Sequence, residues 1–183
     1  VIGGTMNENI AGAGASGGAI LAYPSTVTIK DTVFDGNSAG YGGAISSNGA
    51  ALDISGAAEF NNNYAGTRGG AIDLTKSGTT IGTLESNGTS FVGNVTGGNG
   101  GAVYMVEGST ATFTGGNMDS NQAGSSASGG AIFAYPSTVT IKDTVFDENS
   151  AGYGGAISAN GAVVTVSGTS EFKNNTAAVR GGA

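Results

Sequence analysis

Two short motifs recur in fixed order along the whole chain. Gly-Gly-Ala followed by Ile or Val occurs six times, and a truncated copy follows, with starts at Gly17, Gly42, Gly69, Gly100, Gly129, Gly154 and Gly181. Eight to eleven residues before each copy stands Phe or Met, then any two residues, then Asn. The copies lie 25 to 31 residues apart, a spacing typical of solenoids in which each repeat stacks on its neighbour.

The spacing of the copies itself repeats. Gly17 and Gly129 are 112 residues apart, and residues 17–46 match residues 129–158 at all but two positions. We therefore interpret residues 1–183 as one β-helix segment made of a four-coil unit (17–128), a partial second unit (129–183) and the end of a preceding one (1–16). We expect the native polypeptide to continue past both ends as further coils.

Each repeat predicts three short strands: one after the double glycine, one like Val27-Thr28-Ile29, and one ending at the Phe or Met. Alternation predicts that the second strand points Ile29, Ile54, Leu84, Phe113, Ile141 and Val166 inward. The third strand is expected to bury a second ladder of Phe34, Phe60, Phe91, Met118, Phe146 and Phe172. The predicted fold is all-β, a right-handed single-stranded parallel β-helix (β-solenoid) of six to seven coils with 25–31 residues each.

The asparagine of each repeat has a predicted mechanical role. Asn tolerates left-handed backbone and bonds its local backbone, so it suits a corner, and stacked amides can form hydrogen-bonded ladders. We expect one longitudinal, structural column of Asn37, Asn63, Asn94, Asn121, Asn149 and Asn175.

The two alternating motifs resemble the repeats of polymorphic outer membrane proteins. That resemblance spans essentially the whole chain, from Gly17 to Gly181. It implies a β-helix passenger of the autotransporter type, displayed on the surface of a bacterial cell and associated with adhesion.

Composition excludes several classes of site. The chain has no Cys, His or Trp, so disulfides, Cys/His zinc sites and His- or Cys-based catalysis are impossible. Six basic against thirteen acidic residues argue against nucleic-acid binding. No apolar run reaches the ~18 residues of a membrane helix, so we expect no membrane insertion by this segment. No cofactor and no metal site are expected.

Three surface features suggest binding or chemistry. The outward face of the second strand is predicted to carry Thr28, Thr83, Thr112, Thr140 and Thr165, interrupted by Asp53; it is either a solvated β surface or a threonine array of the ice-binding kind. Tyr23, Tyr41, Tyr135 and Tyr153 are either turn residues packed on neighbouring coils or a recognition stripe. The acids Asp31, Asp35, Asp143, Asp147 and Glu148 are expected to be solvated turn charges rather than a glycosidase pair or a Ca²⁺ site.

These features predict a structural or adhesive segment of a long extracellular or cell-surface protein, without catalysis. A surface-binding solenoid, such as an ice-binding protein, is the alternative, and a polysaccharide-acting enzyme is a distant third. Expected partners are further coils of the same chain, end-to-end copies forming a rod or filament, and surface molecules of host or neighbouring cells.

Overall fold

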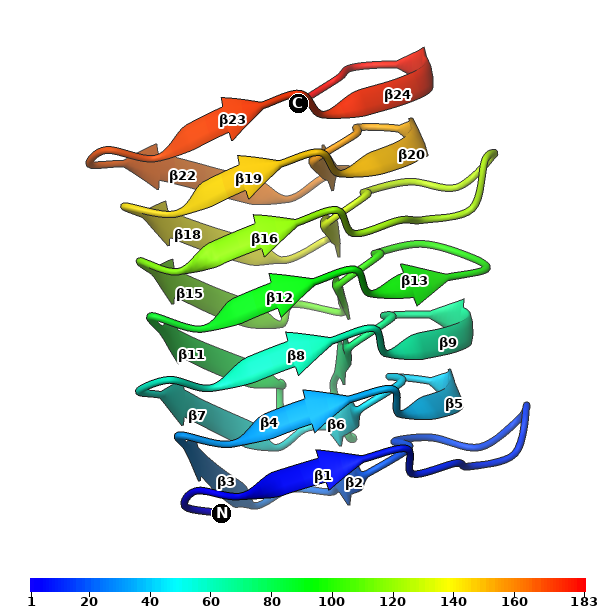
Figure 1. Cartoon of the computed structure of the whole chain (residues 1–183), viewed down its shortest axis with the longest axis vertical. Helices are drawn as coiled ribbons and strands as arrows, with labels where there is room; N and C mark the ends of the chain where they lie inside the picture. Colours follow the sequence, from blue (N-terminus) through cyan, green and yellow to red (C-terminus); the bar gives the residue numbers. More distant parts are fainter.

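A computed structural model describes residues 1–183 as a stack of coils with twenty-four strands and no helix (Figure 1). Every pairing between these strands is parallel and joins one coil to the next, as in Phe34 opposite Phe60. The predicted β-solenoid is therefore confirmed. Because no helix is present, none is long and apolar enough to span a membrane.

Along each coil the chain passes through up to four sheets, labelled D, A, B and C, in that order. Sheet D follows the double glycine and holds β2 (Ile20–Ala22), β6 (Ile45–Asn48), β10 (Ile72–Thr75), β14 (Val103–Val106), β17 (Ile132–Tyr135) and β21 (Ile157–Ala159). Sheet A holds β3 (Thr26–Lys30), β7 (Ala51–Ser55), β11 (Thr83–Asn87), β15 (Thr110–Thr114), β18 (Thr138–Lys142) and β22 (Val163–Ser167).

Sheet B has seven strands, one for each coil: β1 (Thr5–Asn7), β4 (Val33–Asp35), β8 (Glu59–Asn61), β12 (Ser90–Val92), β16 (Asn117–Asp119), β19 (Val145–Asp147) and β23 (Glu171–Lys173). Sheet C was not predicted from the sequence. It comprises β5 (Ser38–Tyr41), β9 (Tyr64–Arg68) and β13 (Val95–Thr96), with β20 (Ser150–Tyr153) and β24 (Thr176–Arg180) as a separate pair. These segments form an arm that projects to the right in Figure 1.

The core lies between sheets D, A and B. It is one cluster of 26 buried residues drawn from successive coils, with partly buried hydrophobic residues of the end coils packed against it. Sheet B contributes its Phe and Met column, while sheet D contributes Ile or Val directly after each Gly-Gly-Ala. Stacking of like residues therefore builds a continuous interior from a narrow coil.

The double glycine is required by two different constraints, as Gly42 and Gly43 illustrate. Gly42 has a φ of 58°, in the left-handed region that favours glycine. A Cβ on Gly43 would lie 2.1 Å from the carbonyl oxygen of Gly70 and 2.6 Å from that of Tyr64, both in the next coil. The corner thus needs both a left-handed residue and a residue without a side chain.

The predicted ladder of the second strand was wrong in one coil, and its member in the last coil, Val166, is in register with Ile141 but 48% exposed. Leu84 lies opposite Leu52 and Ala111, whereas Ser86 lies opposite Ile54 and Phe113. The cause is the insertion after Thr75, where a short antiparallel bridge joins Ser77 to Thr80 and delays the strand by two residues. A shift of two residues returns a side chain to the same face of the strand, so Leu84 still points inward and is fully buried. It lies in the neighbouring inward row, with Leu52 and Ala111, instead of the predicted row.

Candidate functional site

The Phe and Met side chains of sheet B form one continuous interior column. Residues Met6, Phe34, Phe60, Phe91, Met118, Phe146 and Phe172 are direct partners in register. The rings of Phe34 and Phe60 stack with centroids 4.7 Å apart, and those of Phe60 and Phe91 with centroids 4.9 Å apart. These side chains are buried in the middle coils, so their role is packing.

The Asn column is a hydrogen-bonded ladder at the corner between sheets B and C. Asn37 Nδ2 donates to Asn63 Oδ1 at 2.9 Å, and the backbone N–H of Asn37 donates to the same oxygen at 3.0 Å. The second Nδ2 hydrogen goes to the carbonyl of Met6 in the preceding coil at 2.7 Å. The same pattern continues through Asn63, Asn94, Asn121, Asn149 and Asn175. With amide donors and acceptor engaged within the column, these side chains have a structural role.

The threonine surface of sheet A differs from its prediction. Thr28 lies opposite Asp53, and Asp53 lies opposite Glu85, followed by Thr112, Thr140 and Thr165. Thr83 belongs to the neighbouring row, opposite Ala51 and Thr110, because of the same two-residue shift in β11. Thr112 donates from Oγ1 to Glu85 at 3.1 Å. Two adjacent carboxylates thus interrupt the row, an arrangement that favours a solvated polar face over a flat threonine array.

The four predicted tyrosines do not form one stripe. Tyr23 and Tyr135 lie at the ends of sheet D strands and are 59% and 48% exposed. Tyr41 and Tyr153 lie in the arm, in β5 and β20, and only Tyr153 is exposed. The four residues therefore belong to two different faces, one along sheet D and one along the arm.

The acidic turn residues serve as links between coils. Asp31 Oδ1 accepts the backbone N–H of Ala57 at 2.9 Å, and Asp143 Oδ1 accepts that of Thr169 at 2.8 Å. The bond from Thr169 lowers the pKa of the exposed Asp143. Asp35 and Asp147 accept side-chain bonds from asparagines of the next coil. No group of three or more Asp or Glu side chains is placed to hold a metal ion.

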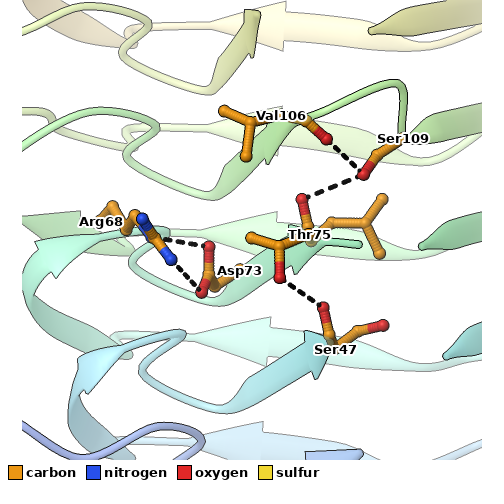
Figure 2. Close-up of polar contacts among 7 residues, drawn as sticks. Ser47, Arg68, Asp73, Thr75, Val106 and Ser109 are labelled. Carbon is orange, nitrogen blue, oxygen red and sulfur yellow. Dashed lines mark hydrogen bonds and ion pairs between the residues drawn. The ribbon is translucent and has the colours of Figure 1, made fainter. Parts of the chain in front are cut away.

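Sequence reasoning missed the one buried ion pair (Figure 2). Arg68, at the end of arm strand β9, donates from Nε to Asp73 Oδ1 at 3.0 Å and from Nη2 to Oδ2 at 3.4 Å. Asp73 lies on the outer side of β10 but is only 2% exposed. The guanidinium lies between the rings of Tyr41 and Tyr104, 4.8 and 4.9 Å from their centroids, and Tyr104 stacks on Phe133 at 5.3 Å. This cluster ties the arm to sheet D across the double-glycine corner.

The electrostatics of the pair follow from burial. Burial raises the pKa of Asp73 to about 6, although the Arg68 guanidinium acts to lower it. For Arg68, burial acts to lower the pKa, but the adjacent Asp73 carboxylate more than offsets this and raises it. The pKa of Tyr104 is raised, mainly by burial. The signal available in the sequence was an Arg and an Asp flanking Gly69-Gly70, but the corner angle that joins them is not readable from spacing.

A second set of polar contacts fixes the corner between sheets D and A (Figure 2). Thr75 Oγ1 donates to the carbonyl of Ser47 at 3.4 Å, and Ser109 Oγ lies 2.6 Å from the carbonyl of Val106 and 3.3 Å from that of Leu74. The contacts of Thr75 with Ser47 and of Ser109 with Leu74 join neighbouring coils, and that of Ser109 with Val106 closes the turn within one coil. The structure also has a shallow open pocket of about 180 Å³ against the arm, lined by small and polar residues such as Gln122, Ser150 and Thr176.

Comparison with known families agrees with the coil geometry. Four segments match the Chlamydia polymorphic membrane protein repeat, at residues 31–51, 57–75, 88–105 and 143–160. In these four segments the chain is similar to the repeats of that family. Each matched segment contains one Phe of the interior column, one Asn of the ladder and one double-glycine corner. No curated protein and no solved structure matches the chain. A β-solenoid with repeats similar to this family fits a repeat segment of a surface protein and supports a cell-surface location in general.

Proposed function

We propose that this chain is a non-catalytic segment of a stiff rod on the outside of a cell, with a structural and adhesive role. The observation that carries the proposal is the asparagine ladder, which repeats the same bonds from Asn9 to Asn175 without a break. A coil that bonds identically to the coil before and after it can be repeated without limit, and such solenoids are extended and offer long lateral faces.

The side chains that could take part in catalysis, chiefly the carboxylates, support the same function. An active site is a local constellation placed on a scaffold, but the carboxylates here recur at the same place in successive coils. Asp31 and Asp143 make equivalent bonds, as do Asp35 and Asp147. The only unrepeated buried carboxylate in the chain, Asp73, is neutralised by Arg68. All of these groups have partners that explain them structurally.

The proposed partners follow from two parts of the surface: the strand edges at the ends of the stack and the lateral faces of the sheets. The outer edges of β1 and β23 in sheet B have no strand partner in the chain, and open edges accept further strands. Further coils, or copies stacked end to end, are therefore the proposed axial partners. Surface molecules of host or neighbouring cells are the proposed lateral partners.

Two measurements test the proposed role. Antibodies raised against residues 1–183 should label intact, unpermeabilised cells of the source organism; labelling only after permeabilisation would contradict the surface rod.

Beads coated with the chain should adhere to cultured cells more than beads coated with a variant carrying Tyr23→Ser, Tyr64→Ser and Tyr135→Ser. Equal adhesion at equal coating density would remove the adhesive part of the proposal.

A further inference from the structure

The outer faces of the three core sheets differ sharply in charge. Sheet A displays Lys30, Asp53, Glu85 and Lys142, and sheet B displays mainly acids, namely Asp35, Glu59, Asp119, Asp147, Glu171 and one Lys173. Sheet D offers two outward positions on each of its six strands, counting the residue that follows β2 and β21, and Asp73 is the only charged residue among them. Asp73 is buried and paired with Arg68. In a chain of net charge −7, sheet D thus presents an essentially uncharged face.

That uncharged face also carries apolar and aromatic side chains, which range from exposed (Tyr135) through partly exposed (Tyr104 and Phe133) to buried (Val106). Tyr104 lies opposite Phe133, and Val106 lies opposite Tyr135, on the adjacent strands β14 and β17. Leu21 and Tyr23 occupy the corresponding positions four coils earlier and are 46% and 59% exposed. Depletion of charge together with enrichment of aromatic residues is the compositional mark of a protein–protein interface core. The exposed Lys76 and Glu107 border the face at the corner to sheet A, as the polar rim of an interface does.

The repeat spacing indicates which partner fits. The two apolar patches, around Tyr23 and around Tyr135, are separated by 112 residues, or four coils, roughly 19 Å along the axis at ~4.8 Å per coil. A second copy has the same two patches at the same spacing. In a parallel pair each patch therefore contacts the same patch of the other copy, and in an antiparallel pair the patch around Tyr23 contacts the patch around Tyr135. Self-association through one shared patch pattern is the isologous arrangement of two-fold dimers. The chain has a net charge of −7, and among the core sheets the excess of acids lies on sheet B. Two copies therefore repel each other less through the uncharged sheet D than through sheet B.

We propose that two copies of this chain associate side by side through the outer face of sheet D, with the patches around Tyr23 and Tyr135 forming two contacts towards the ends of that face. This lateral pairing is independent of end-to-end stacking, which uses strand edges. It adds a second direction of assembly to a rod and joins single rods into pairs.

Disulfide trapping tests the lateral pair directly, because the chain has no Cys of its own. Chains carrying Tyr23→Cys, Tyr135→Cys or both are oxidised at micromolar concentration and separated without reductant. Cross-linking of either single variant supports a parallel pair, and cross-linking of the double variant alone supports an antiparallel pair. Tyr64→Cys on the arm, where Tyr64 is 48% exposed like Tyr135, is the matched control and should stay monomeric.

Sedimentation of the uncross-linked chain gives the second readout. We expect a concentration-dependent species of twice the 17.5 kDa mass, and the double change Tyr23→Glu and Tyr135→Glu should weaken it at least about tenfold, as loss of aromatic contacts does. Tyr64→Glu adds charge on the arm and should leave the dimer unchanged. A wild-type chain that stays monomeric at millimolar concentration, or cross-links that form no more readily than at Tyr64, would overturn the proposal whatever the outcome of the adhesion assay.

Discussion

Asn63 and Asn94 are joined by two hydrogen bonds to one oxygen. Both the side-chain Nδ2 of Asn63, at 2.9 Å, and its backbone N–H, at 3.1 Å, donate to Asn94 Oδ1. Asn94 in turn donates to the carbonyl of Phe60 and to Asn121. One amide therefore connects three coils at a corner that water does not reach, since Asn63 and Asn94 are fully buried.

Replacing Asn94 by Ala should lower the free energy of unfolding by about 3 kcal/mol or more, because each buried polar group left unpaired costs ~1–3 kcal/mol. Urea denaturation measures the change. Asn87→Ala removes an exposed Asn seven residues earlier and should cost less than about 0.5 kcal/mol. Equal losses in the two variants would mean that the ladder contributes nothing specific.

The buried carboxylate of Asp73 should make stability depend on pH. Its pKa in the folded chain is about 6, above its ordinary value of 3.8, so proton binding favours the folded state. The stabilisation is fully present below the unfolded pKa and is lost as pH rises through about 6. The shift corresponds to on the order of 3 kcal/mol.

Wild type should therefore gain stability relative to Asp73→Asn when the pH falls from 8 to 5, with the gain beginning near pH 6 and still growing at pH 5. Denaturant melts of both proteins across this range measure the difference. The same series on Asp53→Asn, which removes an exposed carboxylate of sheet A, is the control. A difference between wild type and Asp73→Asn that stays flat from pH 8 to pH 5 would argue against the burial of this charge.

Truncation of the interior ladder should be costly at its centre. Phe60 is fully buried and its ring stacks on Phe34 and Phe91, so Phe60→Ala should destabilise the chain by about 3–5 kcal/mol. Tyr64→Ala, four residues later and 48% exposed, should cost less than about 1 kcal/mol. Thermal or denaturant unfolding compares the two, and a loss below about 1 kcal/mol for Phe60→Ala would contradict the stacked core.

The ladders were predictable from sequence because they are periodic. A Phe or Met and an Asn at a fixed separation in every repeat must occupy equivalent places if the coils stack, and the registers of Phe34 with Phe60 and of Phe60 with Phe91 follow. Register failed only at Leu84, where the bridge between Ser77 and Thr80 absorbs residues that spacing alone assigns to a strand.

The arm and its ion pair were not predictable for a different reason. Segments such as Ser38–Tyr41 and Val95–Thr96 are short and lack an apolar alternation, so no pattern marks them as strands. Arg68 and Asp73 meet only because Gly69-Gly70 turns the chain back on itself. That turn angle depends on close backbone contact between coils, which is a property of the stack and not of the local sequence.

The last prediction concerns that contact. A methyl group on Gly43 would lie 2.1 Å from the carbonyl oxygen of Gly70 and 2.8 Å from the carbonyl carbon of Tyr64, and both are backbone atoms that cannot rotate away. Gly43→Ala should therefore separate the second and third coils at this corner and cost more than about 3 kcal/mol, at the severe end for single substitutions. Gly66→Ala is the matched control, since its methyl would meet only the carbonyl oxygen of Ala39 at 4.0 Å. Circular dichroism melts should show a large drop in Tm for Gly43→Ala and little change for Gly66→Ala. If Gly43→Ala melts like wild type, the double glycine is not set by the close approach of coils, and its recurrence would then reflect the left-handed backbone of Gly42 alone.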